Sequence, residues 1–152
     1  MYTNPTIGYT SMYMNLTIGD MFKTWSEMDV FDFFDSGLRR RDIVMTLSAL
    51  EELMKRDQVD LVRMALSYYF KNGVVVPCDD FYATTLINSL TGYGRRSKVL
   101  KKVAKRMRHI SRLTRMLNGG IVPDGSSREK LDKKIQNLNR EIIDLLNNDE
   151  LE

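Results

Sequence analysis

The chain has 152 residues, of which 43% are hydrophobic and 28% are charged, a composition typical of a folded domain rather than of a disordered polypeptide. Its single cysteine, Cys78, excludes an intrachain disulfide and indicates a reducing compartment. The N-terminus lacks the basic and apolar regions of a signal peptide, and no apolar stretch approaches the roughly 20 residues of a membrane span. We therefore expect one intracellular domain, cytoplasmic or nuclear, with no membrane partner.

Residues 1–19 carry no charge and predict an irregular N-terminal arm. Asp20 is suited to cap a first helix, and Ser26, with an acid three residues later, is suited to restart that helix in a new direction. Gly37 predicts the end of this helix, and the three arginines at 39–41 predict the start of a second helix that runs to about residue 56. Because cations at a helix start oppose the helix dipole, these arginines either pair with nearby aspartates or serve a ligand.

A third helix, capped by Asp57, is expected over residues 58–71. It is apolar almost all round, which is typical of a helix in the middle of a bundle or at a subunit contact. Asp79 or Asp80 caps a short fourth helix that ends near Gly92. The apolar positions of these helices predict a core that contains Trp25, Phe31, Phe34, Leu47, Leu50, Val62, Leu66, Tyr69, Leu86, Leu90, Val103 and Ile110.

The most unusual stretch is a basic helix expected over residues 95–117. No acid occurs between Asp80 and Asp124, so residues 94–123 carry ten basic side chains and a charge of +10, whereas the N-terminal flank carries −4 and the C-terminal flank −3. At about 100° per residue, apolar side chains fall on one side of this helix and cations on the other. The cations that we expect to bind an anion are Arg95, Arg96, Lys98, Lys101, Lys102, Lys105, Arg108, Arg112 and Arg115.

A loop is expected over 119–127, followed by a C-terminal amphipathic helix over 128–148 that Ser126 begins with a capping box. The apolar residues of this helix recur at spacings of four and three, the seam pattern of a coiled coil. About two heptads are too few for a free-standing coiled coil, so the helix docks either on its own domain or on a second copy. The residues assigned to this seam, and to oligomerisation, are Leu131, Ile135, Leu138, Ile142 and Leu145.

Together these elements predict an all-α fold, an irregular bundle of five or six helices with an uncharged N-terminal arm and a coiled-coil-like C-terminal helix. The helical domain covers residues 20–118 and includes the basic helix. We also expect a homo-oligomer, formed through the C-terminal seam, the apolar third helix or the arm. Oligomerisation would place several basic faces side by side and so multiply weak contacts with phosphates.

No catalytic or metal-binding constellation is apparent. One histidine and one cysteine exclude a His/Cys zinc site within one chain, and Cys78 and His109 are better explained as an incidental cysteine and a phosphate-facing histidine. The glycine turn at 92–94 leads into a helix N-terminus beside Arg95 and Arg96, which suits a single phosphate but lacks the spacing of a phosphate loop. We therefore expect a non-enzymatic protein with no cofactor and no metal.

Four roles are open to the basic helix. Nucleic acid is the leading ligand, because cations along one helical face follow a phosphate backbone and release its counterions. RNA is slightly favoured over DNA since no DNA-reading motif is present, and uniform cations predict little sequence specificity. The alternatives are a protein-interaction or regulatory adaptor, whose basic helix docks an acidic partner or acts as a nuclear-import patch, a helix on an anionic membrane surface, and a solvated face offset by the acidic flanks.

Overall fold

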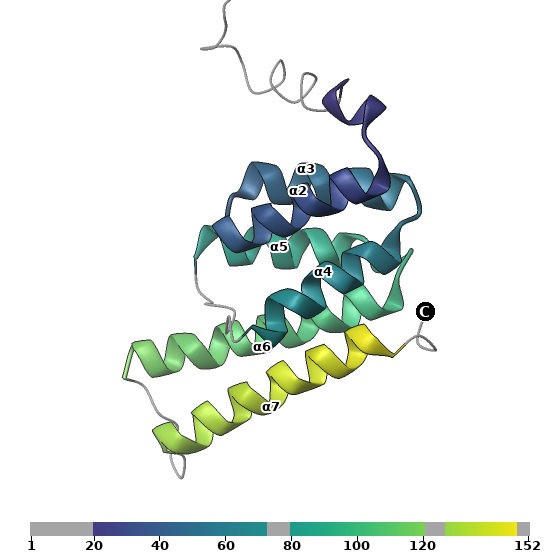
Figure 1. The fold of residues 1–152 in the computed structure, drawn as a ribbon. Helices are drawn as coiled ribbons and strands as arrows, with labels where there is room; N and C mark the ends of the chain where they lie inside the picture. Colours follow the sequence, from purple (N-terminus) through teal and green to yellow (C-terminus); the bar gives the residue numbers. More distant parts are fainter. Residues whose placement is uncertain (1–19, 73–79, 121–126, 149–152) are drawn as a thin grey trace, which may run out of the picture.

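The computed structural model describes residues 20–72, 80–120 and 127–148, and every regular element in these residues is helical (Figure 1). The predicted all-α class is therefore confirmed. The predicted arm, Cys78 and most of the expected loop at 119–127 lie outside the described residues. In chain order the elements are the 3₁₀ turn η1 (Phe22–Thr24) and the helices α2 (Glu27–Arg40), α3 (Ile43–Lys55), α4 (Val59–Lys71), α5 (Phe81–Gly92), α6 (Lys98–Asn118) and α7 (Arg128–Asn147).

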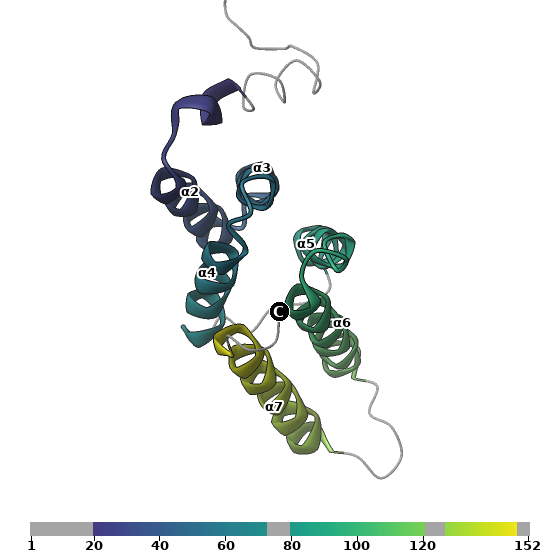
Figure 2. The same ribbon diagram turned by 90° about the vertical axis from the view of Figure 1, so that its right-hand side faces the viewer.

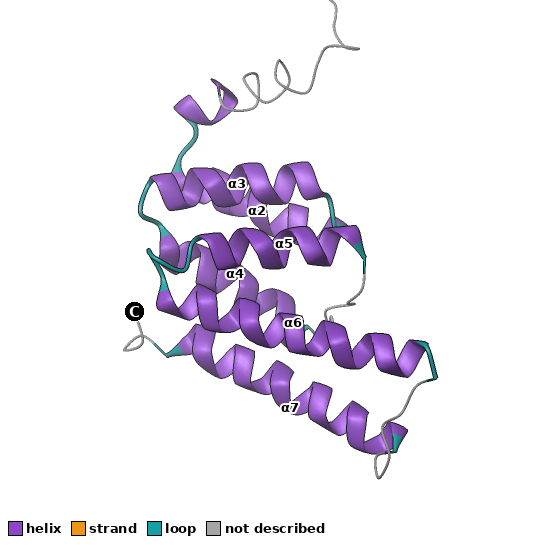
Figure 3. Ribbon diagram, turned by 180° about the vertical axis from the view of Figure 1, so that it is seen from behind, coloured by secondary structure: helices purple, strands orange, loops and turns teal. Residues whose placement is uncertain are grey.

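The helices pack in two layers, which Figure 2 shows roughly along the helix axes. One layer consists of α2, α4 and α7, and the other of α3, α5 and α6. Contacts between the layers are most extensive where α2 meets α3 and where α6 meets α7. Figure 3 views the molecule from the side of the second layer, with α6 and α7 as an antiparallel pair at the edge of the bundle. The basic helix therefore has both a buried side and an outer face.

Side-chain caps explain where most of the helices begin. In each case an oxygen accepts a hydrogen bond from the N–H three residues on, which satisfies one of the free donors of the first turn. The predicted caps Ser26 and Asp80 both do this. The last helix begins at Arg128, as predicted, but its cap is Ser127 and not Ser126, because the Ser127 side chain accepts from the N–H of Lys130. Helices α3 and α6 begin in the same way after Asp42 and Ser97.

The boundary between the first two α-helices differs from the prediction. Gly37 does not end α2 but lies inside it, where an added Cβ would approach the backbone nitrogen of Thr46 to 2.8 Å. Glycine serves here to let α2 pack closely on α3. Helix α2 ends before Arg41, whose φ of 54° is left-handed. The arginines at 39–41 thus close one helix instead of opening the next, and the helix dipole favours cations at that end.

Two of these arginines have acidic partners. Arg39 pairs with Asp35 at 2.8 Å, one of the nearby acids expected for this cluster. Arg41 pairs with Asp80 at 2.6 Å, and its guanidinium lies 5.0 Å from the centre of the Tyr82 ring. Because Asp80 also caps α5, this contact ties the α2–α3 turn to the start of α5.

Asp57 is not the cap of the third predicted helix. Its φ of 58° is left-handed, a conformation that aspartate adopts more readily than most residues. Helix α4 begins after Gln58, which provides no side-chain cap. The Asp57 carboxylate instead accepts a hydrogen bond of 2.9 Å from Arg96, and so joins the α3–α4 turn to the turn before α6.

The predicted core forms with two exceptions. Ten of its twelve members are buried, whereas Trp25 and Leu47 are only half-buried. Trp25 packs edge-to-face with Phe22 and Phe33, with ring centres 5.2 and 5.4 Å apart, and the two phenylalanine rings lie 5.7 Å from each other. This aromatic cluster therefore lies at the margin of the core rather than at its centre.

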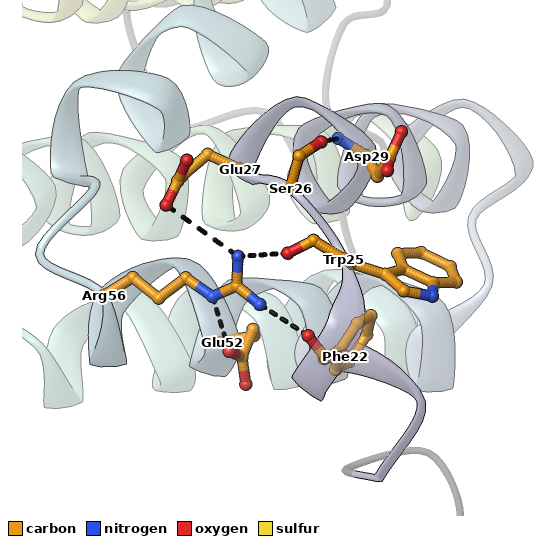
Figure 4. A network of polar contacts seen from close by, with 7 residues as sticks. All are labelled: Phe22, Trp25, Ser26, Glu27, Asp29, Glu52 and Arg56. Atoms are coloured by element: carbon orange, nitrogen blue, oxygen red, sulfur yellow. Dashed lines mark hydrogen bonds and ion pairs between the residues drawn. The ribbon is translucent and has the colours of Figure 1, made fainter.

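Arg56 fixes the segment that leads into α2 (Figure 4). Its guanidinium donates hydrogen bonds to the backbone oxygens of Phe22 at 2.6 Å and Trp25 at 2.8 Å, and pairs with Glu52 at 2.7 Å. The Phe22 oxygen belongs to η1 and also accepts from the N–H of Trp25, whereas the Trp25 oxygen lies in the irregular backbone between η1 and α2. One side chain of the α3–α4 turn thereby anchors the first described residues to the bundle.

The C-terminal helix docks on its own domain, one of the two arrangements expected from its seam. It packs against α6 and α4. Four seam residues, Leu131, Ile135, Leu138 and Ile142, are buried, and the fifth, Leu145, is half-buried. In this arrangement the seam is covered within one chain, and its role in oligomerisation stays a prediction.

Candidate nucleic-acid interface

The basic helix is α6, and packing fixes which side of it faces outward. Ser97, itself buried, caps the helix by accepting a hydrogen bond of 3.1 Å from the N–H of Leu100. The apolar side of the helix is fully buried at Val99, Leu100, Val103, Ala104, Met107 and Ile110. Because these positions fix the rotation of the helix, the cations between them face solvent.

Six cations form a continuous exposed row along this outer face, which we call the basic stripe. Its members recur at every turn of the helix, with two adjacent lysines at 101 and 102, and the row is about 21 Å long. Within the described part of the chain none of them forms an ion pair, and only Arg108 has a side-chain partner, the Thr91 hydroxyl at 3.3 Å. The stripe consists of Lys98, Lys101, Lys102, Lys105, Arg108 and Arg112.

The two arginines of the preceding turn differ from each other. Arg95 is exposed, whereas the Arg96 guanidinium donates hydrogen bonds to the Met54 carbonyl oxygen and to Asp57. Arg96 is thus engaged within the chain. The Ser97 hydroxyl also occupies one N–H at the start of α6, so the single-phosphate site suggested for this turn has fewer free donors than the sequence indicates.

Two further cations of α6 lie outside the stripe. Arg106 is half-buried and pairs with Glu141 at 3.0 Å, so it joins α6 to α7. Arg115, a predicted site residue, is exposed in the last turn, where the helix dipole favours a cation. The ion pair of Arg106 and the helix-end position of Arg115 explain these two charges without a ligand.

His109 lies between Lys105 and Arg112 along the helix and is half-buried. Burial lowers its pKa below the ordinary value of 6.5, Lys134 and Arg112 lower it further, and Glu141 acts in the opposite direction. Lys134 belongs to α7, so the second helix of the pair adds positive potential beside the stripe. The sequence did not reveal this contribution, because the nearness of Lys134 to α6 depends on how α7 docks and not on a local pattern.

The described residues offer little for other chemistries. They contain no group of three or more His, Cys, Asp or Glu that could hold a metal ion. None of their helices has the length and apolar character needed to cross a membrane. A cavity of about 870 Å³ lies against α3, and two of its charged residues, Glu52 and Arg96, already pair with Arg56 and Asp57.

No protein-family model matches this chain, and neither a curated protein nor a solved structure is similar to it. The functional argument therefore rests on the residues and their geometry, and above all on the basic stripe.

Proposed function

We propose that this protein is a non-enzymatic nucleic-acid-binding protein that contacts the phosphate backbone through the basic stripe of α6. The proposal is supported by one observation above the others. Six cations share one exposed helical face, and none is ion-paired within the described residues. Such a surface binds polyanions through charge neutralisation and counterion release.

Repulsion between neighbouring cations of the stripe argues against a face that binds no ligand. Like charges at positions i and i+4 destabilise a helix by about 0.2–0.5 kcal/mol per pair. The stripe contains three such pairs, Lys98 with Lys102, Lys101 with Lys105, and Arg108 with Arg112. A bound polyanion would remove this repulsion, which is a reason for the cations to stand together.

The chemistry of the stripe favours backbone contacts over base reading. Lysine predominates, and its compact charge on a flexible stem suits phosphate oxygens rather than a fixed pattern of base edges. Low sequence specificity follows. We favour RNA slightly over DNA, because the sequence carries none of the motifs by which proteins read DNA.

Fluorescence anisotropy of the purified chain with a labelled single-stranded RNA, a double-stranded RNA and a DNA duplex tests the proposal. We expect binding at low salt that weakens steeply toward physiological salt and changes little when the sequence of the oligonucleotide is scrambled. Absence of binding to all three ligands at low salt would overturn the proposal. The stripe would then be assigned to an acidic protein partner.

A further inference from the structure

Helix α4 is buried over most of its circumference, and the narrow face that it leaves open is apolar in the middle and charged at the ends. Met64 and Tyr68 lie one turn apart on this face and are 44% and 50% exposed. Asp60 lies one turn before Met64, and Lys71 lies about one turn after Tyr68. Both charged residues are exposed, and neither forms an ion pair among the described residues.

A groove runs beside this open face. It has a volume of about 460 Å³ and lies between α4 and the C-terminal end of α7. Its wall includes Leu146, Ser67 and Asn147 together with the residues of the α4 face. A tyrosine ring placed in this groove would pack on Leu146, and its hydroxyl would lie near polar groups, as buried tyrosines require.

The order of residues along α4 makes the open face complementary to itself. In two α4 helices placed antiparallel about a two-fold axis near residue 66, Met64 of one copy lies opposite Tyr68 of the other. Asp60 then lies opposite Lys71 at both ends of the contact, about 16 Å apart along the helix. A parallel arrangement would instead place each charge beside its own kind.

We propose that a second copy of this chain covers the α4 face and forms a two-fold symmetric dimer with antiparallel α4 helices. Each Tyr68 ring occupies the groove of the partner subunit, and two ion pairs between Asp60 and Lys71 close the rim. Four of the five residues of the C-terminal seam are buried within the chain, whereas α4 leaves a matched face open. This proposal does not depend on what the basic stripe binds.

Asp60 and Lys71 also stand where the helix dipole favours an acid and a base, and a charge-reversal cycle separates this role from pairing. Asp60→Lys alone places a lysine of one copy opposite a lysine of the other at each end of the contact. Lys71→Asp alone places two acids opposite each other in the same way. The double variant D60K/K71D restores both pairs in the reverse sense while opposing the dipole. If the two residues pair across the dimer, the dimer is recovered in the double variant. If they act only through the helix dipole, the double variant has the lowest stability of the three and association is the same in all of them.

Sedimentation velocity of the full chain from about 1 to about 200 μM at low salt measures the association. We expect a monomer–dimer equilibrium whose dissociation constant rises at least about tenfold in each single reversal and returns to within about threefold in the double variant. Met64→Asp, at the centre of the face, should leave only monomer. Lys55→Asp, on α3 in the other layer, should change nothing.

Either of two results would overturn the proposal. One is a monomer at every concentration. The other is an oligomer that forms equally well in the two single reversals, the double reversal and Met64→Asp, which would place the contact on another surface. Circular dichroism of each variant establishes that the helices are retained.

Discussion

The guanidinium of Arg63, on α4, donates two hydrogen bonds to the backbone oxygen of Leu146 at the end of α7, at 3.0 and 3.2 Å. It also donates to the backbone oxygen of Asn148 at 2.7 Å, and Arg63 is only 4% exposed. The last carbonyl oxygens of a helix have no partners within the helix, and a cation is favoured there. Arg63 thus fastens the polar end of α7 to the bundle, while the apolar seam fastens the rest.

Replacing Arg63 by methionine should therefore destabilise the protein by about 2–4 kcal/mol, because buried carbonyl oxygens lose their donors. Arg63→Lys should recover only part of the loss, since an ammonium group cannot reach all of these oxygens in the same geometry. Urea unfolding measures both variants. Arg140→Met, on the exposed side of α7, is the control and should cost less than about 0.5 kcal/mol. Equal midpoints for the buried and exposed variants would contradict this account.

Gly37 and Gly92 form a matched pair for testing the α2–α3 contact. Gly37→Ala should destabilise the protein by about 1–3 kcal/mol, because the added Cβ would meet the Thr46 backbone nitrogen at 2.8 Å and that backbone cannot rotate away. Gly92→Ala, with nothing within 4 Å, should be neutral or stabilising by up to about 1 kcal/mol. Thermal unfolding compares the two, and a Gly37→Ala variant as stable as the natural chain would show that the helices can separate at no cost.

Local patterns predicted much of this fold, because they depend on interactions within one or two turns. The periodicity of the basic helix gave its rotation, and the caps Ser26 and Asp80 gave two helix starts. Gly37 misled the prediction because a glycine that ends a helix and one that admits a neighbouring helix look the same in sequence. Only the contact with Thr46 distinguishes them.

Features set by tertiary packing were out of reach of the sequence. The pairing of Asp57 with Arg96 and the position of Lys134 beside His109 each join elements more than 20 residues apart. The seam of α7 was compatible with docking in the same chain or on a second copy, because an apolar stripe does not specify its partner. The membership of the basic stripe could be predicted, whereas the engagement of Arg96 within the chain could not.

His109 provides a titration test of the proposed interface. Its pKa is lowered in the free protein, so the neutral form predominates at pH 7, and protonation favours the unfolded state as the pH falls below about 6.5. Phosphates bound on the stripe would raise this pKa. The affinity for nucleic acid should therefore increase as the pH falls from the ordinary pKa of histidine toward the lowered pKa of His109. NMR titration of the imidazole with and without saturating nucleic acid measures the shift. An unchanged pKa would place His109 outside the contact, and His109→Gln should retain salt dependence while losing this pH dependence.

The proposed dimer predicts that nucleic-acid segments are bridged. Helices α4 and α6 lie in opposite layers, so two copies joined through α4 carry their basic stripes on outer faces that point away from each other (Figure 2). An immobilised duplex should then capture a second, labelled duplex in the presence of the natural chain. The D60K variant should bind each duplex without bridging them, and D60K/K71D should restore the bridge. Capture by D60K as efficient as by the natural chain would contradict this arrangement.

The salt dependence of nucleic-acid binding in a stripe variant tests the central claim most directly. Lys101, Lys105, Arg108 and Arg112 are changed to glutamine, and a control variant of equal charge loses four exposed cations elsewhere, at Lys23, Arg40, Lys55 and Lys133. The stripe variant should keep its helical circular dichroism, bind a duplex more weakly, and show a slope of log affinity against log salt that is shallower by about 3 to 4 units. The control should keep nearly the natural slope. Equal slopes in the two variants would contradict the assignment, because binding would then depend on net charge and not on the stripe.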